Sequence, residues 1–175
     1  MTAKSIHGNS PEEIRLALEQ SLSDDFTPTL AIVFISIKLD RKAVSTMLDK
    51  MGIDVIGATS AGEFTDGHQS EGASVIMLLD IPKEEYSIFF ETIGDGSSEV
   101  TARQLGEVAL RQFNHPAIIF CSTFLSAEGI AIDGETLMRN IENVVGSQVN
   151  IFGGMAGDDL SFSGSYVFTN NDEKD

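Results

Sequence analysis

Ser60 has the most catalysis-like surroundings in the chain. It lies in residues 55–63, VIGATSAGE, whose A-x-S-x-G differs at one position from the G-x-S-x-G nucleophile elbow of α/β-hydrolases. That elbow needs a strand before the serine, a helix after it, and histidine and acid partners later in the chain. The strand is predicted, but residues 63–72 carry two glycines and no apolar stripe. No sequence context ties His68 or His115 to Ser60, so a serine hydrolase remains only the less favoured alternative.

Other reactive side chains give weaker signals. Cys121, the single cysteine, ends an apolar run and is expected to be a core thiol, and no Cys/His spacing resembles a zinc site. Asp158 and Asp159 are adjacent carboxylates, which we interpret as a solvated loop rather than a metal site. We expect His7 to lie in a mobile tail, and the chain has no P-loop motif. The sequence therefore predicts no catalytic residue, no metal and no cofactor.

The loop around Ser60 has a second copy. Residues 151–159, IFGGMAGDD, repeat its pattern of a strand, two small residues, Ala-Gly and an acid. Small residues let a backbone approach a ligand closely, and loops at strand ends of open α/β sheets commonly hold ligands. The nine predicted ligand-binding residues are Gly57, Thr59, Ser60, Gly62, Glu63, Gly153, Gly154, Gly157 and Asp158. The alternative is that both loops only pack the two halves together.

Helices and strands alternate along the chain. A capping box at Ser10 starts one helix, and the apolar spacing predicts others over about 40–50, 97–113 and 133–145. Continuous apolar runs or alternation predict the strands, which cover about 30–35, 54–58, 73–79, 86–92, 117–121, 149–152 and 165–169. A turn is expected at residues 94–96, and the last residues, 170–175, are expected to be frayed.

The order α-β-α-β-loop-β occurs twice, which indicates an internal duplication. AIVFIS at 31–36 and AIIFCS at 117–122 are identical at four of six positions. We predict an α/β fold with a mixed β-sheet core flanked by helices. The chain of 175 residues is expected to form one domain, 1–175, with repeat one at about 10–93 and repeat two at about 97–170.

The charge balance excludes several classes of partner. The formal net charge is -16, and the 11 Lys and Arg residues are not clustered, which argues against nucleic acid and anionic membrane surfaces. Apolar runs such as 30–35 are far too short to span a bilayer, and the first residues lack the apolar segment of a signal peptide. We therefore expect a cytoplasmic protein without membrane insertion.

Three stretches resemble the N-terminal part of the FIST domain, a sensory domain of bacterial signalling proteins that also occurs in F-box proteins. They are GATSAGE (57–63), SEGASVIMLL (70–79), and DGETLMRNIENVVGSQVNIFGGMAGDD (133–159) followed by YVFTN. The resemblance implies a ligand-sensing input module coupled to kinase, chemotaxis or cyclase outputs. Some members are associated with haem, but no motif carries a haem histidine to this chain. The family normally continues into a C-terminal half, whose docking surface would be exposed here or used in self-association.

The favoured hypothesis is a non-enzymatic input domain of a bacterial signal-transduction system that senses a small molecule. An amino acid is one candidate ligand, because a buried Glu63 or Asp158 would prefer a positive partner such as an amino group. A signalling output domain or protein is the expected partner, and a homo-oligomer is left open. The alternatives are a protein-interaction module without a ligand and, less favoured, the hydrolase that uses Ser60.

Overall fold

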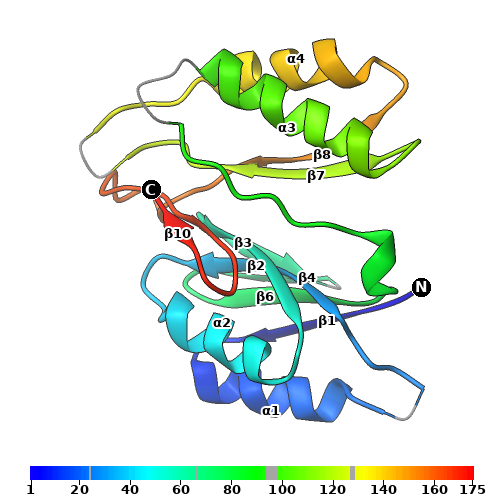
Figure 1. The fold of residues 1–175 in the computed structure, drawn as a ribbon. Coiled ribbons are helices and arrows are strands. Elements are labelled where there is room, and N and C mark those ends of the chain that lie inside the picture. The colour runs from blue at the N-terminus through cyan, green and yellow to red at the C-terminus, as the bar shows by residue number, and fades with distance from the viewer. Residues whose placement is uncertain (24, 66, 94–97, 127–128) are drawn as a thin grey trace.

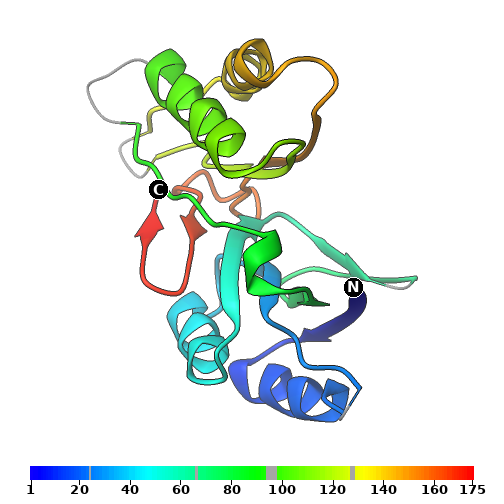
Figure 2. The same ribbon diagram turned by 45° about the vertical axis from the view of Figure 1, so that its right-hand side comes forward.

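A computed structural model describes residues 1–23, 25–65, 67–93, 98–126 and 129–175. It has two outer helix layers with strands between them (Figures 1 and 2). The helices are α1 (Pro11–Ser21), α2 (Arg41–Lys50), α3 (Ser98–Gln112) and α4 (Gly134–Val145), with a short 3-10 turn η1 (Lys83–Glu85). The strands are β1 (Thr2–Gly8), β2 (Leu30–Ser36), β3 (Asp54–Ser60), β4 (Glu63–Thr65), β5 (His68–Ser70), β6 (Ser74–Asp80), β7 (Ala117–Ser122), β8 (Asn150–Met155), β9 (Val167–Phe168) and β10 (Glu173–Lys174).

The predicted mixed sheet is confirmed. Its six strands follow the order β1-β6-β2-β3-β9-β10. Strands β2 and β3 pair in parallel, and every other pair of neighbouring strands in this sheet is antiparallel. A second parallel pair, β7 and β8, forms a separate two-stranded sheet beneath α3 and α4 (Figure 1). The small hairpin β4–β5 follows the Ser60 loop. The order helix, strand, helix, parallel strand therefore occurs in both halves of the chain.

Polar caps fix where the helices begin. The Ser10 hydroxyl accepts the Glu13 amide at 3.2 Å, and the Glu13 carboxylate in turn accepts the Asn9 amide at 2.8 Å. Asp40 caps α2 and Asp133 caps α4 in the same manner. These bonds satisfy amides that a helix start leaves unpaired. The helix predicted to start at Ser10 is confirmed.

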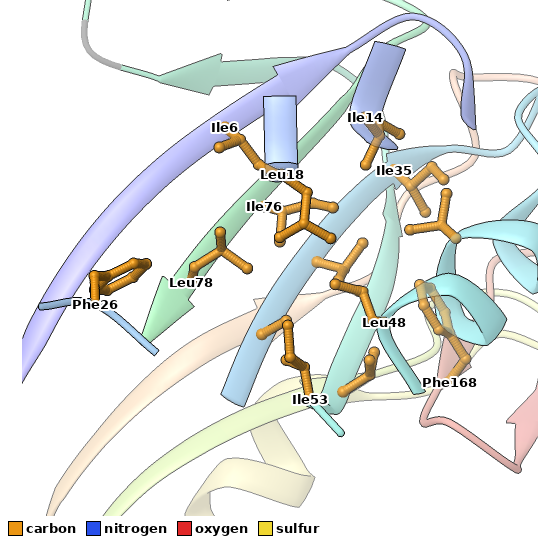
Figure 3. Close-up of a cluster of buried hydrophobic side chains, with 14 residues drawn as sticks. Ile6, Ile14, Leu18, Phe26, Ile35, Leu48, Ile53, Ile76, Leu78 and Phe168 are labelled. Atoms are coloured by element: carbon orange, nitrogen blue, oxygen red, sulfur yellow. The ribbon is translucent and has the colours of Figure 1, made fainter. Parts of the chain in front are cut away.

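The two halves are packed to different degrees. In the first half, α1 and α2 lie on the sheet through a cluster of fully buried side chains that includes Leu18, Leu48 and Ile76 (Figure 3). In the second half, four buried residues of α3 and α4, among them Leu137 and Ile141, meet strand residues that are only partly buried. The second core is therefore smaller and less enclosed.

Three expectations about chain segments differ from the structure. Residues 86–92 form no strand: the chain there is extended and makes no backbone–backbone hydrogen bond to another described residue. His7 lies in β1 rather than in a tail, and its ring stacks on His68 with 4.9 Å between centroids. The C-terminal residues are not frayed, because Glu173 pairs in β10 and binds Arg41 at 3.0 Å. The turn at 94–96 and the predicted helix start at Ser97 lie outside the described residues.

Candidate functional site

The two small-residue loops lie against each other. Gly157 donates its amide to the Thr59 carbonyl at 2.8 Å, and Asp159 donates to the Ser60 carbonyl at 3.2 Å. A Cβ on Gly157 would come within 2.9 Å of the Ala61 backbone nitrogen, so only glycine permits this approach. We call this contact between residues 57–63 and 153–159 the loop junction. It joins the end of β3 in one half to the segment after β8 in the other.

Glu63 is the buried charged residue of the loop junction, with 2% of its surface exposed. Its carboxylate accepts the Ser60 hydroxyl at 2.6 Å and the Ala73 amide at 3.1 Å. A buried carboxylate is costly unless donors surround it, and these two donors bind one oxygen each. Glu63 therefore closes the turn after β3 onto the start of β6.

Thr59 and Asp158 also have partners within the protein. Thr59 exchanges hydrogen bonds with Tyr166: its amide donates to the Tyr166 carbonyl, and its hydroxyl accepts the Tyr166 amide, both at 2.9 Å. Asp158 accepts the Ser163 amide at 2.8 Å. Asp159, which we did not predict as a site residue, accepts the Ser36 hydroxyl at 2.6 Å and lies 3.3 Å from the Lys38 ammonium.

The remaining predicted glycines serve different local geometries. A Cβ on Gly57 would lie 2.3 Å from the buried ring of Phe168, so this glycine admits β9 to the sheet. Gly62 and Gly153 have positive φ angles of 130° and 139°, which side chains rarely adopt. The structure thus brings together Thr59, Ser60, Glu63 and Gly157, and places Gly153 and Gly154 within β8. Whether any of the nine residues contacts a ligand stays a prediction.

Ser60 lacks the geometry of an activated nucleophile. Its hydroxyl donates to Glu63, and within the described residues no histidine is hydrogen-bonded to it. The ring of His68 stacks on His7 instead. A serine nucleophile needs a base within hydrogen-bond reach, so the hydrolase alternative has no structural support at this position.

A cavity of about 370 Å³ adjoins the loop junction through Gly57 alone. We call it the chamber. Its walls are the extended segment 86–93, strand β7, one face of α3, part of α4, and β9. Apolar side chains dominate, among them Leu105, Phe113 and Ile119, while Glu91 and His115 contribute polar groups. Of the nine predicted residues, Gly57 alone lines it. This volume lies within the range of small-molecule pockets.

Tyr86 fixes the start of the segment that crosses the chamber. Its hydroxyl lies 2.7 Å from an Asp54 carboxylate oxygen and 2.9 Å from the Thr29 carbonyl. Burial, and then the hydrogen bond with the Asp54 carboxylate, raise the pKa of Tyr86 to about 12. The phenol therefore stays neutral at physiological pH and anchors segment 86–93 to the first sheet.

Cys121 lines the chamber and provides a chemical probe of it. Burial raises the pKa of its thiol to about 11, from an ordinary 9.0. Since the thiolate is the reactive form, we expect iodoacetamide to modify the native protein at pH 8 about 100-fold more slowly than the urea-unfolded chain. The rate should rise as the pH approaches 11. Cys121 is the single cysteine, so mass spectrometry assigns the product directly; equal native and unfolded rates would contradict the prediction.

Comparison with known protein families identifies the family of this chain. The FIST N domain family model matches residues 29–174, which is most of the chain and includes both loops and the chamber strands. The chain belongs to the FIST N family. The FIST N domain is a sensory domain found in signal-transduction proteins. A search of curated proteins and a search of solved structures each gave no match.

Metal-binding clusters and membrane-spanning helices were both sought in this FIST N domain. Among the described residues there is no group of three or more His, Cys, Asp or Glu side chains that could hold a metal ion. In the same part of the chain, no helix is long and apolar enough to cross a membrane.

The sequence did not predict the chamber residues, because a strand, a helix and a linker contribute them from distant positions in the chain. One available signal was the apolar run at 86–92, which we assigned to the sheet.

Proposed function

We propose that this FIST N domain is a non-enzymatic input module that senses a ligand bound in the chamber. The observation that carries the proposal is the chamber itself, an apolar cavity bounded by both halves of the domain. A ligand there would contact segment 86–93 and β7 of the second half, and Gly57 and Phe168 of the first sheet. Binding would therefore change how the two halves are held together. A sensory role for the family supports the same conclusion.

The loop junction supports a coupling role in this proposal. Gly157 and Asp159 attach the segment after β8 to the end of β3, and Tyr166 continues this attachment through Thr59. A movement of one half relative to the other would first change the lengths of these hydrogen bonds. Transfer of the signal to an output domain or protein would then use the surface near the loop junction. The direct packing of the loops favours this role over a ligand pocket between them.

The chamber residues do not form a clear haem site. His115 is the sole histidine among the residues that line the chamber, and it lies on the exposed rim. His7 and His68 stack on each other elsewhere, and the Cys121 thiol is held in its neutral form by a raised pKa. Haem is therefore only one member of the ligand panel below.

A thermal-shift screen tests the proposal. The panel contains amino acids, small carboxylates, small apolar molecules such as indole, and haem. A ligand that binds the native state at 100 times its Kd should stabilise it by about 2.7 kcal/mol. Filling the chamber with Ala109→Phe should abolish the effect, because Ala109 is a buried chamber residue of α3. Gln104→Phe, on the exposed face of the same helix, is the matched control.

The same screen separates the chamber from the loops. If a ligand's effect survives Ala109→Phe but is lost in Glu63→Gln, the ligand binds at the loop junction, and an amine-bearing ligand is then favoured. Slower alkylation of Cys121 in the presence of ligand would locate it in the chamber independently. A panel in which nothing stabilises the wild-type domain would remove the support for a small-molecule sensor.

A further inference from the structure

Among the described residues, the second half of the domain has no counterpart of strand β6 of the first half. In the first sheet the order is β1-β6-β2-β3, with β1 preceding α1 in the chain. In the second half, segment 86–93 precedes α3 as β1 precedes α1, and β7 and β8 form a parallel pair as β2 and β3 do. The position that β6 fills beside β2 has no counterpart beside β7.

The segment expected to fill that position lies elsewhere. β6 follows β3 after a loop and returns to pair with β2. β9 follows β8 after the corresponding loop, but it pairs with β3, at Gly57 and Ala58. The space under Phe168 that Gly57 provides stabilises this arrangement. β9 therefore extends the first sheet and leaves the edge of β7 open.

Within the described ranges, no strand pairs with the open edge of β7. The Ser122 carbonyl accepts the Ala156 amide at 2.7 Å, so this residue turns toward the β8 side. Because successive strand residues turn their backbone groups to opposite edges, Ala117, Ile119 and Cys121 present theirs at the open edge. Segment 86–93 is extended and likewise makes no backbone–backbone hydrogen bond with the part of the chain that the structure describes. Both line the chamber.

Helix α3 indicates which side chains are missing. In the first half, Ile14 and Leu18 of α1 share a buried cluster with Ile76 and Leu78, alternate residues of β6 (Figure 3). In the second half, Thr101, Leu105 and Ala109 of α3, together with Phe113 just after the helix, line the chamber instead. A strand beside β7 would place alternate apolar side chains under this face, as β6 does under α1.

We propose that the chamber is a strand position and that its ligand is an extended peptide segment, added antiparallel to β7. This proposal rests on the proposed function and specifies the class of ligand. The peptide has apolar side chains at alternate positions, which pack under α3, and its backbone pairs with the edge of β7. Basic residues flank it, because Glu85 and Glu91 line the chamber and the protein has a net charge of -16.

A fluorescent peptide tests this assignment. The probe carries the β6 sequence SVIMLL with two lysines at each end, and fluorescence anisotropy measures its binding to the full chain. We expect saturable binding that weakens at least tenfold when every internal amide of the peptide is N-methylated, since such a peptide cannot donate to β7. Ala109→Phe should weaken binding at least tenfold, whereas Gln104→Phe should not. Replacing the flanking lysines by glutamates should also weaken it.

Each alternative result is decisive. Equal binding of the N-methylated peptide would overturn strand addition, and this comparison uses the wild-type protein alone. If indole protects Cys121 but the peptide does not bind, the peptide proposal fails while the proposed function stands. If neither the peptide nor any compound of the panel binds in the chamber, both the peptide proposal and the proposed function fail. A dimer in sedimentation that Ala109→Phe dissociates would identify a second copy as the occupant instead.

Discussion

Replacing Gly153 by alanine is expected to lower the free energy of unfolding by about 3–5 kcal/mol, a value reserved for a few severe mechanisms. Two of them coincide here. Gly153 has a φ of 139°, which disfavours any side chain, and a Cβ would lie 1.7 Å from the Phe120 carbonyl oxygen. Because that oxygen belongs to the paired strand, relief requires separating β7 from β8. Urea unfolding followed by circular dichroism measures the change.

The adjacent glycine provides the control. A Cβ on Gly154 would meet nothing within 4 Å, so Gly154→Ala should change stability by about 0.5 kcal/mol or less. If the two variants are equally stable, the backbone strain at Gly153 is not real. If Gly153→Ala keeps its stability but loses ligand binding, close approach of a ligand would explain the glycine. The pair therefore separates a conformational from a binding role for these predicted site residues.

The element order was predictable because local chemistry specifies it. The capped start of α1 and the apolar runs of β2, β3 and β7 have short-range signals. β1 carries no such signal, because TAKSIHG is largely polar and becomes a strand by pairing with β6. The apolar run at 86–92 has strand chemistry but no neighbour to pair with. Pairing depends on tertiary partners, which propensity does not contain.

The internal repeat was predicted from a sequence match whose paired residues do not occupy equivalent positions in the two halves of the structure. The match of AIVFIS with AIIFCS sets Ala31 against Ala117 and Val33 against Ile119. In the structure, Ala31 and Val33 face the helices in the buried cluster, while Ile118 and Phe120 take that place in the second half. A shift of one residue turns every side chain of a strand to the other face. The repeated order of elements holds, and the residue correspondence is displaced by one.

The site was predictable only where its residues adjoin in sequence. The Ala-Gly steps and terminal acids of both loops drew attention to residues that the structure does bring into contact. The chamber joins residues from α3, β7, β9 and the linker, and its size depends on a strand that is absent from one position. No window of sequence contains that information. A comparison of the two halves, element by element, is what exposes it.

Removing the Glu63 side chain is expected to cost about 2–4 kcal/mol of unfolding free energy. Glu63→Ala leaves the Ala73 amide and the Ser60 hydroxyl without their acceptor in a site that is 2% exposed. An unsatisfied buried donor costs roughly 1–3 kcal/mol, and the lost side chain adds a cavity. Glu63→Gln keeps the shape and one acceptor oxygen, so it should cost about 1 kcal/mol. Glu71→Ala, at an exposed position between β5 and β6, should be nearly neutral.

The order of these three variants distinguishes two roles for Glu63. If Glu63 only holds the loop junction together, Glu71→Ala should be the most stable variant, Glu63→Gln the next and Glu63→Ala the least stable. Ligand binding in the chamber should then stay intact in Glu63→Gln. A ligand residue gives near-normal stability in Glu63→Gln together with loss of an amine-bearing ligand. Since both donors to the carboxylate come from the protein, we expect the first order. If Glu63→Ala is as stable as the wild type, the carboxylate does not hold the turn after β3 to β6.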